Sequence, residues 1–122
     1  MKIKLIIITA NELRHKFFRR KISSFKHVDV KLCLAEKNSS RQHYKVIRSK
    51  DFSKMEKGHF LERQKSEKKY FGSFLKKQSE IKNLKIIERG EFNFNQSIIK
   101  KICTFKPDLI ISYGCSIIKR PI

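Results

Sequence analysis

The sequence predicts an α/β protein with a Rossmann-like parallel sheet of about four strands and flanking helices. The chain opens with a β-branched apolar run, Leu5-Ile6-Ile7-Ile8, which is typical of a strand buried on both faces. Segments with helical periodicity then alternate with short apolar segments. The last apolar run, Leu109-Ile110-Ile111, has the same character and follows a helical pattern that Lys106-Pro107 ends. This alternation favours parallel strands joined by right-handed crossover helices.

The N-terminal part of the chain predicts a strand, a helix and a second strand. The first strand runs from Lys2 to Ala10, and Asn11 is a good N-cap for a helix from Glu12 to about Ser24. His27 to Ala35 forms the second strand, whose alternating V-D-V-K-L-C-L pattern places it nearer the sheet edge. Glu36 to His59 shows no clear pattern and is expected to be a weakly structured insertion, either mobile or closing over a site.

The expected first helix has an apolar half and a charged half on a wheel of about 100° per residue. Arg19 and Arg20 fall in the charged half, which we expect to face solvent. Arg14 lies in the apolar half, in the first turn, where a helix N-terminus already favours anions. Asn11, Arg14 and His15 are therefore the candidate substrate-binding or anion-binding residues. The alternatives are a capping role for Asn11 and a structural, solvated or general-base role for His15.

The C-terminal part continues the alternation. Phe60 to Lys77 predicts a second helix, and Asn83 to Glu88 a third strand that ends in a turn at Arg89-Gly90-Glu91. Asn93 or Asn95 caps a third helix. The residues that share the apolar face of this helix are Ile98, Ile99, Ile102 and Phe105.

The composition points to polyanionic partners. Lys and Arg number 30 against 11 Asp and Glu, giving a net charge of +19, which attracts tRNA, other nucleic acid, nucleotide phosphates or acidic membrane surfaces. The alternative is that the basic residues form a generic solvated surface. Lys, Ile, Asn and Phe are abundant together, and a coding bias that enriches all four would explain the number of lysines without a binding role. The opening apolar run is too short for a signal peptide, and no stretch approaches a membrane span. We therefore expect a soluble, cytoplasmic protein.

The sequence contains neither a zinc-binding cysteine motif nor a glycine-rich nucleotide-binding motif. The cysteines Cys33, Cys103 and Cys115 lie far apart in apolar segments, which predicts reduced, buried thiols and no zinc site. The turn after the first strand contains neither G-x-G-x-x-G nor G-x-x-x-x-G-K-[ST], so dinucleotide or P-loop chemistry has no support. Ligands of open α/β sheets bind outside the carboxyl ends of strands. The turn from Tyr113 to Ile117 is therefore the first candidate site.

Two segments resemble one enzyme family. The run P-D-L-I-I-S-Y-G-C-S-I-I (107–118), preceded by an amphipathic helix and by N-L-K-I-I-E-R-G-E-F-N (83–93), resembles the formyltransferase family. That family includes methionyl-tRNA formyltransferase, glycinamide ribonucleotide formyltransferase and sugar N-formyltransferases. N-E-L-R-H-K-F-F (11–18) is similar to an N-x-x-R-H-x-F-F pattern that follows the first strand in a subgroup of formyltransferase-like proteins.

The resemblance implies transfer of a formyl group from 10-formyltetrahydrofolate to an amine, such as a nucleotide-linked amino sugar or an aminoacyl-tRNA. Carried over by position, it implies a pterin pocket lined by Tyr113, Gly114, Cys115, Ser116 and Ile117. The family's catalytic Asn, His and Asp lie further along than Ile122 and cannot be matched, so no catalytic residue is nominated. We expect an incomplete, N-terminal part of a formyltransferase domain that is inactive by itself. The alternative is a small basic module that binds RNA, or a partner at its open sheet edge, without catalysis.

Overall fold

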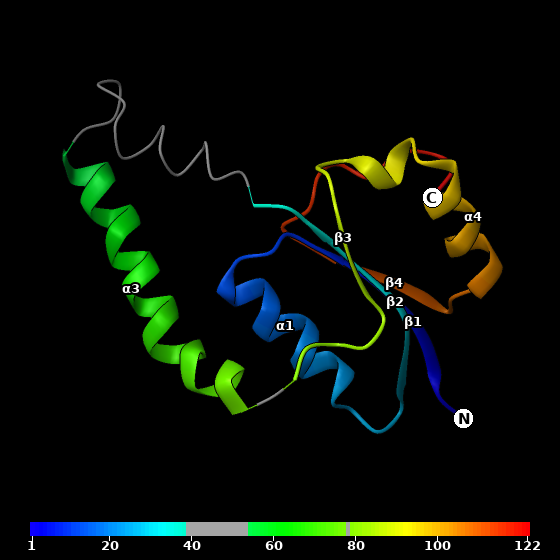
Figure 1. Ribbon diagram of the computed structural model, residues 1–122, viewed down its shortest axis with the longest axis horizontal. Helices are drawn as coiled ribbons and strands as arrows, with labels where there is room; N and C mark the ends of the chain where they lie inside the picture. Colours follow the sequence, from blue (N-terminus) through cyan, green and yellow to red (C-terminus); the bar gives the residue numbers. More distant parts are fainter. Residues whose placement is uncertain (39–53, 78) are drawn as a thin grey trace.

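Figure 1 shows the computed structural model, which describes residues 1–38, 54–77 and 79–122. Four parallel strands form one sheet in the order β3-β2-β1-β4, which confirms the predicted Rossmann-like α/β class. The elements in chain order are β1 (Ile3–Thr9), α1 (Leu13–Ser23), β2 (Val28–Glu36), α3 (Lys54–Lys77), β3 (Leu84–Ile87), the 3-10 helix η1 (Glu91–Asn93), α4 (Gln96–Phe105) and β4 (Leu109–Tyr113).

Helices cover both faces of the sheet. α4 and η1 lie on one side, and α1 lies on the other with α3 packed against its outer surface (Figure 1). Within the described ranges, no helix combines the length and apolar character that a membrane span requires.

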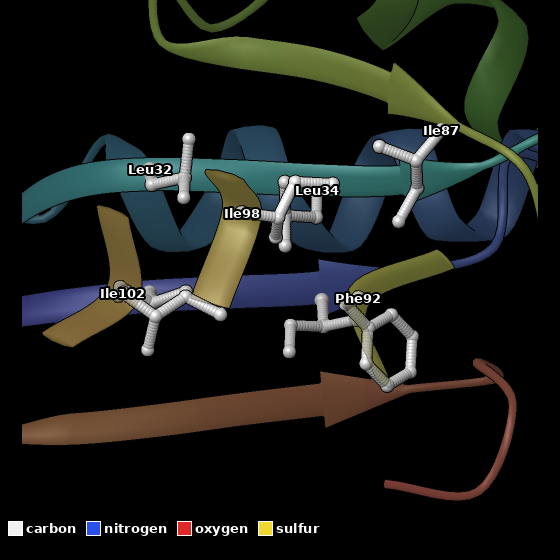
Figure 2. Close-up of a cluster of buried hydrophobic side chains, with 8 residues drawn as sticks. Leu32, Leu34, Ile87, Phe92, Ile98 and Ile102 are labelled. Atoms are coloured by element: carbon white, nitrogen blue, oxygen red, sulfur yellow. The ribbon is translucent and has the colours of Figure 1, made fainter. Parts of the chain in front are cut away.

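The main apolar core lies between the sheet and α4. Figure 2 shows side chains from β2, β3, η1 and α4 meeting there, with α1 on the far side of the sheet. Burying each such side chain contributes about 1.5–3 kcal/mol relative to leaving it exposed. The buried members of this cluster are Ile6, Ile8, Leu32, Leu34, Ile87, Phe92, Ile98 and Ile102. Two of them, Ile98 and Ile102, lie on the predicted apolar face of α4, so the helical periodicity identified core residues correctly.

The opposite face of the sheet is less apolar than predicted. The buried residues of α1 are His15 and Arg19, although Arg19 was assigned to the solvated half of the helix. Part of the apolar half of α1 faces α3, because the ring of Phe17 packs against Phe71 and Phe74 of that helix with ring centroids 4.7 and 4.8 Å apart. A helix packed between a sheet and another helix buries two faces, one against each neighbour. The buried residues of α1 include the charged Arg19.

The expected positions of two strands are wrong. β2 is an interior strand and β4 is an edge strand, with Leu109 52% and Tyr113 41% exposed. The alternating pattern in β2 has a local cause: β3 pairs with the segment Cys33–Glu36, and among the described residues no strand pairs with the preceding V-D-V-K segment on that side. The apolar run of β4 reflects contact of Ile110 with the α4 core rather than cover on both faces.

Some boundaries also differ from the sequence-based expectation. Glu36 still belongs to β2, and α3 begins at Lys54, so the segment 54–59 of the expected insertion is helical. The rest of that insertion, 39–53, lies outside the described residues. Cys33 is buried as expected, but Cys115 is only half-buried and Cys103 is exposed. It follows the buried Ile102 by one residue, about 100° around the helix, and so points away from the core.

The predicted cap of α4 is formed by Asn95, whose side-chain oxygen accepts hydrogen bonds from the N–H groups of Ser97 (3.0 Å) and Ile98 (3.4 Å). Asn95→Ala should lower the free energy of unfolding by about 1 kcal/mol, because the two N–H groups lose their acceptor. Urea denaturation would measure this change. Asn95→Ser keeps a capping oxygen and should lie closer to the native protein; equal stability of all three proteins would contradict a capping role.

Candidate functional site

The chain reverses its winding direction between β1 and β4. β2 and β3 lie on one side of β1 and β4 on the other, so the carboxyl ends of β1 and β4 form the topological switch point where open α/β sheets bind ligands. The two strand ends are joined directly, because the N–H of Ala10 donates to the carbonyl of Tyr113 at 3.3 Å. The segment that begins α1 and the segment that follows β4 therefore leave the sheet side by side.

Gly114 fits against His15 at this point. The backbone of Gly114 has a φ of +70°, a left-handed conformation that favours glycine, and a Cβ there would lie 2.3 Å from Nε2 of His15. The ring of Tyr113 packs on His15 and on Phe18, with centroids 4.9 and 5.0 Å apart. The two sequence segments that carry the family resemblance are thus in contact.

His15 acts as part of the cap of α1. Its Nδ1 accepts the N–H of Glu12 at 3.1 Å, and the Glu12 side chain accepts the N–H of His15, which completes a capping box. Burial, together with the nearby Arg14, lowers the pKa of His15 to about 4. The ring is therefore neutral at pH 7, with its proton on Nε2 beside Gly114. It supplies no positive charge to an anion.

The other two predicted anion-binding residues are engaged in the fold. Nη1 of Arg14 lies 2.5 Å from a Glu12 oxygen and 2.6 Å from a Glu67 oxygen, so two carboxylates balance its charge and link α1 to α3. Asn11 is not the N-cap of α1; that position belongs to Glu12. The backbone of Asn11 exchanges two hydrogen bonds with the side chain of Asn38 (3.2 and 2.9 Å).

Sequence reasoning missed the pair Arg19 and Glu80. Arg19 is 1% exposed; its Nε and Nη2 donate to the two Glu80 oxygens at 3.2 and 2.8 Å, and Nη2 also donates to Asn11 Oδ1 at 2.9 Å. Arg20 donates to the same carboxylate at 3.2 and 3.0 Å. Periodicity could not reveal this pair, because Arg19 lies in a basic run and its partner is 61 residues away.

The turn after β4 is fixed by two side chains from other elements. Glu36, buried at the end of β2, accepts the N–H of Ser116 at 2.7 Å and also the N–H of Gly90. Asn93 of η1 donates to the carbonyl of Ile117 and accepts the N–H of Lys119, both at 2.8 Å. The turn is therefore rigidly attached to β2 and η1 across the carboxyl edge of the sheet.

The predicted pterin-pocket residues differ in what they can offer a ligand. The side chain of Ile117 is 80% exposed, and the ring of Tyr113 is partly exposed. Cys115 packs against the α4 core. Its burial, and to a smaller extent the negative charge of Glu36, raises the pKa of the Cys115 thiol, so this side chain is not a reactive thiolate. Among the described residues, no group of three His, Cys, Asp or Glu side chains could hold a metal ion.

No protein-family model, curated protein or solved structure matches this chain.

The contact between Gly114 and His15 can be tested by a double-mutant cycle. Gly114→Ala should cost about 1–2 kcal/mol for the left-handed backbone alone, and more in the native protein because its Cβ would collide with Nε2. In a His15→Ala background that collision is absent, so the same substitution should cost less. Urea denaturation of the four proteins measures both costs. Equal costs in the two backgrounds would show that the histidine does not limit position 114.

Acid should weaken the contribution of Glu80 to stability. Burial favours the neutral form of this carboxyl, but hydrogen bonds from Arg19 and Arg20 outweigh it and lower its pKa from 4.5 to about 2. The stabilisation is therefore complete above pH 4.5 and is lost as the pH falls towards 2. The difference in unfolding free energy between the native protein and Glu80→Gln should shrink over this window. Glu88→Gln, at an exposed carboxylate, is the control and should show a much smaller change; a pH-independent difference for Glu80→Gln would contradict the assignment.

Proposed function

We propose that this chain forms the folate-binding part of a formyltransferase-like protein, which transfers a formyl group from 10-formyltetrahydrofolate to an amine. The observation that carries this proposal is the contact of Tyr113 and Gly114 with His15. It joins the two segments of the family resemblance at the switch point, where α/β sheets bind their ligands.

The turn after β4 suits a flat heterocycle. The Tyr113 ring and the exposed Ile117 side chain offer apolar surface, and Gly114 has no side chain to keep a ligand from the backbone. Because Glu36 and Asn93 already hold this turn, a ligand would not have to order it, which lowers the entropic cost of binding.

We assign no residue of this chain to proton transfer from the amine. His15 is unsuited to that role, because its Nδ1 accepts a backbone hydrogen bond and its Nε2 lies against Gly114. The acceptor in this proposal is an amine on a nucleotide-linked sugar or on an aminoacyl-tRNA.

A second candidate function is RNA binding without catalysis, favoured by the outer surface of α3. The exposed basic residues of this helix, against the exposed Glu56 and Glu62, are Lys54, Arg63, Lys65, Lys68, Lys69, Lys76 and Lys77. Binding of this kind neutralises phosphates and weakens steeply with salt. A gel-shift titration with tRNA at several salt concentrations distinguishes it from folate binding, which should be far less salt-sensitive.

The folate proposal predicts binding of 5-formyltetrahydrofolate, a stable isomer of the cosubstrate, to this chain. Ile117→Ser should weaken that binding about tenfold, because it removes apolar contact at an exposed position without disturbing the core. Met55→Ser, at an 84% exposed residue of α3, is the matched control and should leave binding unchanged. Isothermal titration calorimetry measures both. Absence of binding by the native chain, or equal effects of the two substitutions, would refute the assignment.

A further inference from the structure

A second site lies away from the turn after β4, between α1 and α3. It is a cleft of about 550 Å³, bounded by the start of α1, the residue Asn38 beyond β2, and the middle of α3. This volume is in the range of small-molecule sites. The lining residues are Asn11, Glu12, Leu13, Lys16, Asn38, Leu61, Gln64, Lys65, Glu67 and Lys68.

The charges in this cleft do not balance. Its two carboxylates, Glu12 and Glu67, are both bound by Arg14, at 2.5 and 2.6 Å. This guanidinium, which is not itself among the lining residues, offsets only one of the two carboxylate charges. The three lysines of the lining add three positive charges, so the groups in and beside the cleft carry a net positive charge.

The lysines of the cleft, Lys16, Lys65 and Lys68, are not paired with its carboxylates, which bind Arg14 instead. Within the described part of the chain, none of the ammonium groups of Lys16, Lys65 and Lys68 forms a hydrogen bond or an ion pair. Lys65 and Lys68 are three residues apart and so share one face of α3. Lys16 belongs to the opposite wall, on α1. An anion in the cleft would meet positive charge from both sides.

The remaining lining adds groups that fit the organic part of a ligand. Leu13 and Leu61 supply an apolar surface, one from each helix, and Asn38 lies at the rim with its side-chain amide bonded to the backbone of Asn11. Lysine binds phosphate as a point charge, without demanding the bidentate geometry of arginine. The combination suits a molecule with a doubly charged phosphate end and a flat, partly apolar body.

We propose that this cleft binds a phosphorylated small molecule of the nucleoside diphosphate class. The two phosphates lie between Lys16 and the pair Lys65 and Lys68, and the nucleoside lies on the leucines. This site does not depend on the folate proposal, since it shares no residue with the turn from Tyr113 to Ile117.

Isothermal titration calorimetry of the full chain with ADP, UDP and pyrophosphate tests the site. The triple variant Lys16→Ala, Lys65→Ala, Lys68→Ala should bind ADP or UDP at least about tenfold more weakly than the native chain. The control triple variant Lys54→Ala, Lys69→Ala, Lys77→Ala removes the same charge from exposed positions of α3 outside the cleft and should bind nearly as well as the native chain. All substituted side chains are at least partly exposed, and unfolding curves of both variants should match the native curve.

Two results would overturn the proposal. Equal loss of binding in the two triple variants would mean that the net charge of +19 attracts phosphates diffusely. No binding of ADP, UDP or pyrophosphate by the native chain at millimolar concentration would mean that the cleft is not a phosphate site. Because the cleft variant leaves the turn after β4 intact, its binding of 5-formyltetrahydrofolate should be unchanged, so failure of either site is distinguishable from failure of the other.

Discussion

The imidazole of His15 holds together the carboxyl ends of β1 and β4. One ring nitrogen caps the start of α1, and the other lies where a side chain at position 114 would have to be. The turn after β4 can approach α1 only because Gly114 is a glycine in a left-handed conformation. β4 is an edge strand paired with β1 alone, so this contact and the bonds from Glu36 and Asn93 fix the position of its turn. The candidate folate site depends on that position.

The few acidic residues of this basic chain are concentrated at structural positions. Glu80 is clamped by Arg19 and Arg20, and the two carboxylates nearest the start of α1 balance Arg14. A buried arginine is tolerated only where its charge is paired and its donors are bonded. Because Glu12 and Glu67 bind Arg14, the nearby Lys16, Lys65 and Lys68 are left without an ion pair among the described residues. In the cleft between α1 and α3 this positive charge lines a recess of about 550 Å³.

Sequence periodicity predicted the elements well and the identity of their neighbours poorly. The apolar face of α4, the cap at Asn95 and the turn at Gly114 follow from local rules, and the structure contains all three. The burial of Arg19, the capping of α1 by Glu12, and the placing of β2 inside the sheet depend on residues distant in sequence. A helical wheel assumes one buried face, so it could not foresee a helix packed on both a sheet and α3. A helical wheel also shows no residue of another helix, so it could not distinguish an anion-binding role of Arg14 from an ion pair with Glu67 of α3.

We propose that the turn after β4, held against His15, binds the folate. The most direct measurement is a titration of the 15N-labelled chain with 5-formyltetrahydrofolate, followed by two-dimensional amide NMR. Folate binding at this turn should give saturable shifts concentrated in the amides of Tyr113 to Ile117 and in those at the start of α1, with little change in α4 or the outer face of α3. Shifts confined to α3, or no saturable shift at all, would contradict it.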